Sequence, residues 1–160
     1  MNDPLEVLFN IDVILAGQLL EGLRRDLGTI LSSELDADLD LFSDPAGRNS
    51  VCSVLTSLAW EVERRGAEGS MEEVASILDW VEHLAVDLPP PIAPGTFDTV
   101  RNGILACFLE PLLPVGPQLH GVVMAHLGPA TRALLPPQHA GWLDVEGSWP
   151  VEWRDANHGR

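Results

Sequence analysis

The sequence has 160 residues, with 24 acidic residues, nine arginines and no lysine, and its formal net charge is -15. A chain of this length can bury roughly 70% of the surface of its unfolded form, enough for one domain without metals or disulfides. The missing lysine excludes a Walker-type phosphate site, a Schiff base and a Ser-Lys dyad, and the net charge opposes direct binding to nucleic acid. We predict a single domain over residues 1–160 that needs no cofactor.

The sequence Asp3-Pro4-Leu5-Glu6 is typical of a helix start, with Asp3 as the N-cap and Pro4 at the first helical position. A stripe of leucines at helical spacing follows, made up of Leu8, Leu15, Leu19, Leu23, Leu27 and Leu31. Acids occupy the place where a signal peptide has basic residues, and no segment reaches about 18 uncharged apolar residues. We expect a long first helix in a cytoplasmic protein that does not enter a membrane.

The stretch SELDADLDLFSD, residues 33–44, is the densest group of acids in the chain. Asp36, Asp38 and Asp40 have the spacing of the first ligands of a calcium loop, but the glycine and the later glutamate that such a loop needs are missing, which argues against a metal site. Acidic and apolar residues alternate here, which predicts a short strand or an extended loop with its carboxylates on one side. Residues 1–47 hold ten acids and two arginines, a surplus that can serve a partner or solubility alone.

Two amphipathic helices are predicted in the middle of the chain. Asn49 or Ser50 caps the first, which ends in a basic pair, and Ser70 opens a capping box for the second, which ends before a run of prolines. The short connection between them predicts antiparallel neighbours. Each helix carries one tryptophan, Trp60 or Trp80, which we expect in the core or at its edge.

Cys52 and Cys107 each lie in an apolar, helix-like segment. A small buried thiol fits such surroundings, so we expect two buried cysteines rather than a disulfide or a nucleophile. Two cysteines alone do not complete a structural zinc site, which has four ligands.

Two further helices are predicted after the prolines. Thr96 is expected to cap a helix that is apolar nearly all round, the pattern of a central buried helix, and Pro111 and Pro114 are expected to end it. Pro117 opens the next helix, which stops at a Gly-Pro pair before a short turn through Leu135.

Residues 136–160 differ in character from everything before them. They contain three of the five tryptophans among proline, glycine and charged residues, which predicts an irregular tail. The predicted fold is therefore all-α, an irregular or repeat-like bundle of about five helices over residues 1–135 with an extended tryptophan-containing C-terminal tail.

No strong catalytic motif occurs in the sequence. The histidines never recur at i, i+4, and neither a His-Glu-x-x-His nor a Gly-x-Ser-x-Gly motif is present. A hydrolytic site can still be assembled at a distance from Glu110 and the three histidines His120, His126 and His139. We expect no catalytic residues and no metal ligands.

Glu110 follows the most apolar helix of the chain. An acid in such a place is either capped at the surface or buried with a cationic partner. We expect a structural pair of Glu110 with Arg101 or Arg132 that fixes the last helices.

The segment SLAWEVERRGAEGSMEEVASILDWVEHL, followed by TVRNGILACFLEPL and HLGPATRALL, resembles a family of small bacterial helical proteins that look like immunity proteins of polymorphic toxins. In that family a helix ending in Phe-Leu-Glu-x-Leu precedes a helix ending in Leu-Gly-Pro. The resemblance covers about residues 51–135 and rests on Val100, Asn102, Phe108, Leu109, Glu110, Leu112, Leu127, Gly128 and Pro129. It implies a helical fold and brings no catalytic residues, and Pro111 departs from the family pattern.

We therefore expect a non-enzymatic acidic inhibitor of the immunity type, which binds and neutralises a bacterial toxin with a basic surface. Complementary charge would speed the association. The residues expected to bind the partner are Glu34, Asp36, Asp38, Asp40, Asp44, Glu61, Glu72, Glu73, Trp149 and Trp153. The alternatives are an acidic interaction scaffold or DNA mimic that acts on a host defence protein, and the hydrolase with a distance-assembled site.

Overall fold

The computed structural model describes residues 3–89, 98–112 and 117–135. The elements in these ranges are α1 (Pro4–Leu27), α2 (Glu34–Phe42), α3 (Val51–Ala67), α4 (Met71–Val86), α5 (Thr99–Gly103), the π-helical segment η1 (Ile104–Leu109), α6 (Glu110–Leu112), α7 (Pro117–His126) and α8 (Pro129–Arg132). All are helical, which confirms the all-α prediction, and the predicted tail lies outside the described residues. Of these helices none has both the length and the apolar character needed to cross a bilayer.

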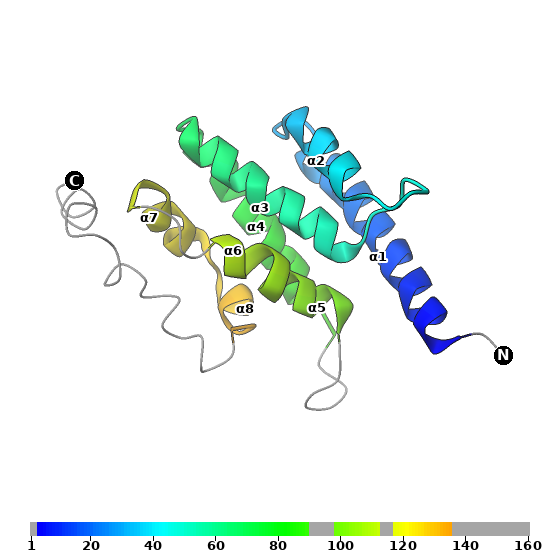
Figure 1. Cartoon of the computed structure of the whole chain (residues 1–160). Helices are drawn as coiled ribbons and strands as arrows, with labels where there is room; N and C mark the ends of the chain where they lie inside the picture. The colour runs from blue at the N-terminus through cyan, green and yellow to red at the C-terminus, as the bar shows by residue number, and fades with distance from the viewer. Residues whose placement is uncertain (1–2, 90–97, 113–116, 136–160) are drawn as a thin grey trace.

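Helix α3 lies at the centre of the bundle. It contacts α1, α2, α4, α7 and the continuous helix made of α5, η1 and α6 (Figure 1). Its core-facing residues include Val54, Leu55, Leu58 and Val62, none of them more than 1% exposed. Burying an aliphatic side chain of this size stabilises the fold by roughly 1.5–3 kcal/mol, so the packing around α3 carries much of the fold.

The start of α1 is as predicted. Pro4 is its first residue, and the side chain of Asp3 accepts a hydrogen bond from the Leu5 backbone N–H at 2.9 Å. Only the second half of α1 is buried in the bundle, through Ala16, Leu19, Leu23 and Leu27. In Figure 1 the first turns of α1 extend beyond the other helices.

The acidic stretch forms the helix α2, so the prediction of a strand or extended loop is wrong. Leu35 and Leu39 are one helical turn apart, and both are buried at 4% exposure. Glu34 and Asp36 lie in the first turn, where carboxylates interact favourably with the positive end of the helix dipole. The same apolar residues satisfy a period of two and a helical period, and burial of this pair favours the helix.

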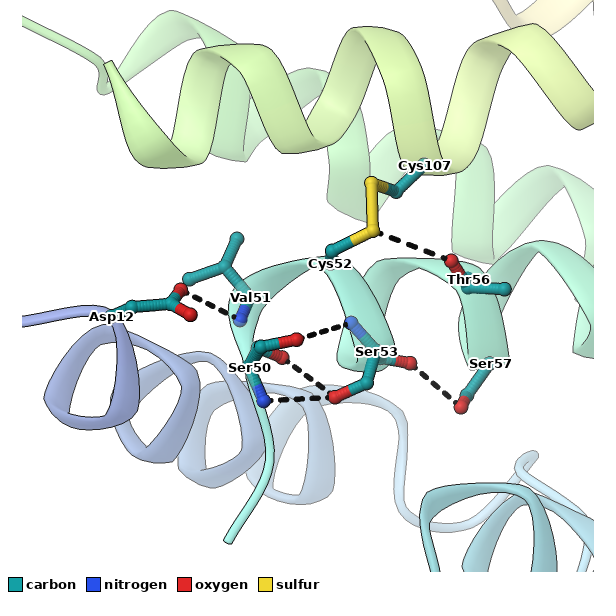
Figure 2. Close-up of a disulfide and its surroundings, with 8 residues drawn as sticks. All are labelled: Asp12, Ser50, Val51, Cys52, Ser53, Thr56, Ser57 and Cys107. Carbon is teal, nitrogen blue, oxygen red and sulfur yellow. Dashed lines mark hydrogen bonds between the residues drawn. A yellow bond between two sulfur atoms is a disulfide. The ribbon is translucent and has the colours of Figure 1, made fainter. Parts of the chain in front are cut away.

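The start of α3 is capped on two sides (Figure 2). The hydroxyl of Ser50 accepts the N–H of Ser53, and the hydroxyl of Ser53 accepts the N–H of Ser50, a reciprocal capping box. The carboxylate of Asp12, on α1, accepts the N–H of Val51 at 3.0 Å. The predicted cap at Ser50 is therefore confirmed, and its neighbour ties α1 to α3.

The turn between α3 and α4 is built by the backbone rather than by a side-chain cap. Gly69 has a φ of 79°, which favours glycine, and the N–H of Ser70 donates to the carbonyl of Arg65 at 2.8 Å. The hydroxyl of Ser70 makes no cap hydrogen bond, so the predicted capping box of α4 does not form. The two helices pack against each other as expected from the short connection.

The helix that follows the prolines begins at Thr99, with Asp98 rather than the predicted Thr96 as its N-cap; Thr96 itself lies outside the described residues. The carboxylate of Asp98 accepts the N–H of Arg101 at 3.1 Å. The helix runs through Pro111 to Leu112, and Pro114, the second proline expected to end it, lies outside the described residues. Proline lacks an N–H and clashes with the carbonyl four residues earlier in an α-helix, and the wider π-helical turns of η1 lie immediately before it.

A partly buried contact holds α8 to α4. Pro129, where a short turn was predicted to start, opens the short helix α8. The carboxylate of Glu82 accepts the N–H groups of Ala130 and Thr131 at 2.7 and 2.9 Å and the Thr131 hydroxyl at 2.5 Å. Burial would raise the pKa of Glu82, but the hydrogen bonds from Thr131 and Ala130 outweigh it and hold the pKa below its usual value. Any side chain at Gly128 would collide with Glu82, which explains the glycine there.

Cys52 and Cys107 form a disulfide, with their Cα atoms 5.4 Å apart (Figure 2). The prediction of two buried thiols is therefore wrong. Cys52 is exposed on the first turn of α3, and Cys107 is half-buried on η1. The bridge lies at the edge of the contact between these two elements. Disulfides are rare in cytosolic proteins and common in oxidising compartments.

Replacing both cysteines, Cys52→Ser with Cys107→Ser, should lower the free energy of unfolding by about 2–4 kcal/mol, because the bridge shortens the unfolded chain over a separation of 55 residues. Urea denaturation measures the difference. A thiol reductant should shift the wild-type midpoint to that of the double variant and leave the variant itself unchanged. A wild-type midpoint that ignores the reductant would contradict the bridge.

Candidate interaction surface

Arg64, in the last turn of α3, contacts three carboxylates. Its guanidinium lies 3.0 Å from Glu34, 2.8 Å from Asp38 and 2.6 Å from Glu61. The first two acids belong to α2 and the third to α3 itself. One arginine therefore holds α2 against the end of α3.

Arg65, the next residue of α3, also contacts three carboxylates. It lies 3.1 Å from Glu61, 3.4 Å from Glu68 and 3.3 Å from Glu73, and it also donates to the carbonyl of Ile30. We call this group the arginine-carboxylate cluster; it consists of Arg64, Arg65, Glu34, Asp38, Glu61, Glu68 and Glu73. Five carboxylates against two arginines leave it with three surplus negative charges.

Glu61 is the buried centre of the cluster, with 0% exposure. Besides the two arginines, it accepts hydrogen bonds from the backbone N–H and the hydroxyl of Ser32, at 2.9 and 2.8 Å. Burial would raise the pKa of the Glu61 carboxyl, but the hydrogen bonds from Arg64 and Ser32 outweigh it and lower the pKa below its ordinary value. Glu61 is therefore ionised in the folded protein, and it is not available to a partner at the surface.

The remaining acids of the predicted set lie outside the cluster. Asp36 pairs with Arg24 of α1 at 2.8 Å, with both side chains exposed, and such pairs contribute at most about 1 kcal/mol. Asp44 accepts from its own loop, including Arg48 at 2.9 Å. Asp40 and Glu72 are exposed and make no ion pair within the described residues. Trp149 and Trp153 lie outside the described residues.

The predicted pair of Glu110 with an arginine does not form. Glu110 is exposed, Arg101 pairs with Asp98 at 3.4 Å, and Arg132 donates to two backbone carbonyls near the end of α7. Among the described acids, the buried one is instead Glu61. Pro111 follows Glu110 directly, and the last turn of the helix presents this carboxylate outward.

The histidines proposed for a hydrolytic site are only partly described. His120 is buried in α7, His126 lies 3.6 Å from Asp79 of α4, and His139 falls outside the described residues. Over the described ranges no three side chains among His, Cys, Asp and Glu form a group that could hold a metal ion.

The described arginines share one property: each is bonded to a carboxylate or a backbone carbonyl of this same chain. They are Arg24, Arg25, Arg48, Arg64, Arg65, Arg101 and Arg132. A partner approaching this part of the molecule therefore meets a surplus of carboxylates and arginines that are already engaged.

The sequence carries one local signal for the cluster. Arg64 and Arg65 stand three and four residues after Glu61, the spacing at which side chains meet on one face of a helix. The contributions of Ser32 and Asp38 come from elsewhere in the chain and depend on how α2 packs.

Replacing Glu61 by glutamine should lower the free energy of unfolding at pH 7 by about 2–4 kcal/mol, because it leaves two partly buried arginines without their shared carboxylate. The folded pKa of Glu61 is depressed, so its contribution is complete above the unfolded value of about 4.3 and is lost as the pH falls through the folded pKa. The difference between wild type and Glu61→Gln should therefore shrink from pH 7 to about pH 3.

Urea denaturation across this pH range tests the effect, with Glu63→Gln as the matched control. Glu63 lies two residues away on α3, is exposed and makes no ion pair within the described ranges. Burial raises the pKa of the Glu63 carboxyl, so removing its charge should not lower the free energy of unfolding at pH 7. Equal losses for the two variants, or a Glu61→Gln effect that is constant with pH, would contradict the assigned role.

Comparisons with known proteins add no independent support for a function. No family model matches the chain, and neither a curated protein nor a solved structure matches it. The resemblance of residues 51–135 to immunity-like proteins therefore stays a prediction, and the function has to be inferred from the geometry and charge of the molecule.

Proposed function

We propose that the protein is a non-enzymatic, acidic inhibitor of the immunity type that binds a bacterial toxin through a basic surface on that toxin. The observation that carries the proposal is the arginine-carboxylate cluster, with its surplus of negative charge held between α2, α3 and α4. The proposal is also supported by the described arginines, because each of them is already bonded to an acceptor of this same chain.

The cluster suits recognition because part of it stays accessible. The side chains of Glu34 and Glu68 are 65% and 58% exposed, while Arg64 and Arg65 hold them in place from below. Carboxylates that are already ordered lose little side-chain freedom when a partner binds. A surface of one sign also attracts an oppositely charged partner over several ångströms and raises the association rate.

The exposed acids Asp36 and Asp40 of α2 and Glu72 of α4 lie outside the cluster and add further negative charge to these two helices. Glu61 is left out of the binding surface because it is buried. The cytoplasm is the compartment we propose for the complex, since an inhibitor of this type acts where its toxin acts. Because the cytoplasm keeps thiols reduced, we expect Cys52 and Cys107 to be present there as thiols and to form the disulfide only under oxidising conditions.

Co-expression with the neighbouring reading frame of its genome should restore growth if that frame encodes the toxin. Purified toxin should then bind the protein with an association rate that falls as salt rises. The triple variant Asp36→Asn, Asp40→Asn, Glu72→Gln should slow association by about tenfold or more, reduce its dependence on salt and change dissociation little, because charge acts mainly on the encounter. Stopped-flow kinetics at several salt concentrations measures both rates.

Glu110→Gln is the matched control, because it also removes an exposed acid, but on α6. It should leave the association rate within about twofold of wild type. Persistent toxicity in the presence of the protein, or a triple variant that associates at the wild-type rate, would sink the proposal.

A further inference from the structure

An apolar groove of about 550 Å³ runs between α1 and α4. Its walls include Leu15, Leu19 and Gly22 of α1, Trp80 and Leu84 of α4, and Leu88 just after α4. Trp80 also donates from its indole N–H to Asp26 of α1 at 3.1 Å, which fixes the ring across the groove. The groove is thus a built feature of two packed helices.

The apolar surface continues from the groove along the exposed half of α1. Leu8 and Ile11 stand seven and four residues before Leu15, so they continue its side of α1, and Ile14 lies beside them on the outer flank of the helix. Their exposures are 57%, 44% and 60%. Leu8 also lines a second hollow, of about 330 Å³, against the starts of α3 and α5. Contiguous exposed apolar surface of this kind typically marks an interaction site.

Most charges beside this strip are negative. The exceptions are Arg48, which lies 5.0 Å from the Phe9 ring and pairs with Asp44, and Arg25 and His83 at the groove, where the His83 ring contacts the Asp79 carbonyl. Residues 1–23 contain no arginine, lysine or histidine, and α1 carries Glu6, Asp12 and Glu21 over the same length. At the groove itself, Arg25 is already paired with Asp26 at 2.9 Å, and Asp87 is exposed without an ion pair in the described residues. A second copy of this chain would bring equal acids against these, whereas a basic partner would neutralise them.

We propose that the groove and the exposed half of α1 bind an amphipathic helix of a partner protein, with its apolar face in the groove and basic residues along its edges. The occupied length from Leu8 to Arg25 corresponds to roughly 26 Å, or a helix of about 17 residues. An apolar helix face laid in an apolar groove is a common mode of peptide recognition. The inference rests on the proposed binding function and names the chemistry of the partner.

Two glycines of α1 offer a matched pair of variants. A side chain added at Gly22 would extend toward Trp80, whose ring carbon lies 3.8 Å from the added Cβ, so Gly22→Leu fills the groove. A side chain added at Gly17 meets nothing within 4 Å. Both replacements put a better helix former into the same helix, so neither should impair folding.

The probe is a synthetic peptide with three repeats of Leu-Lys-Lys-Leu-Leu-Lys-Leu, about 21 residues long. Its counterpart with glutamate in place of every lysine has the same apolar face and the opposite charge. Calorimetric titration of the full chain should show binding of the lysine peptide and none of the glutamate peptide. Gly22→Leu should lower the affinity for the lysine peptide by at least about tenfold, whereas Gly17→Leu should bind it with wild-type affinity.

A second pair tests the exposed strip. The double variant Ile11→Gln, Ile14→Gln should lower the affinity for the lysine peptide by about tenfold. Leu41→Gln, which removes a 71% exposed leucine from α2, should leave this affinity unchanged. Equal weakening by Gly22→Leu and Gly17→Leu, or equal binding of both peptides, would overturn the inference. A wild-type dimer in sedimentation analysis that Gly22→Leu dissociates would also overturn it, because the occupant would then be a second copy.

The two proposals can fail separately. Loss of peptide binding by the groove variants with an unchanged rescue of growth would assign the toxin to the acidic surface alone. A groove that binds the lysine peptide as described, in a chain that neutralises no toxin, would leave the groove assignment standing and remove the inhibitor function.

Discussion

The fold depends on an ionised carboxylate that has no exposed surface. Glu61 can stay charged inside the bundle only because Ser32, Arg64 and Arg65 supply hydrogen bonds to its oxygens. These donors come from the segment before α2 and from the last turns of α3, and the arginines extend the contact to further acids on α2 and α4. Meeting the needs of this one group therefore fixes three helices relative to one another.

The structure also places a charged surface and an apolar groove in different parts of the molecule, which the acidic composition alone does not indicate. Around Arg64 and Arg65 the surface is polar, ordered and negatively charged, whereas α1 and α4 present an apolar groove with acids at its margins. Charge can guide a partner at long range, while burial of apolar surface governs how long a complex lasts. A protein with both features can combine fast encounter with slow release.

Local sequence signals predict the helix starts at Pro4 and Pro117 and the cap at Ser50, because proline and small polar residues stabilise the first turn of the helix in which they stand. The prediction of a strand or extended loop for the acidic stretch is wrong because, over nine residues, the spacing of its leucines fits both a strand and a helix. What decides between them is packing of α2 on α3, aided by arginines more than twenty positions away. The same limit applies to the disulfide and the groove, which exist only once distant helices meet.

The bridge between Cys52 and Cys107 gives the chain a covalent ring that contains α4 and most of α3. A single peptide-bond cut anywhere inside that ring would leave one molecule rather than two fragments. Under a pulling force on the two termini, the ring would also shield its segment from extension, withholding on the order of 180–200 Å of contour length. Mechanical and proteolytic resistance would thus be concentrated in the middle of the protein, where α3 and α4 pack.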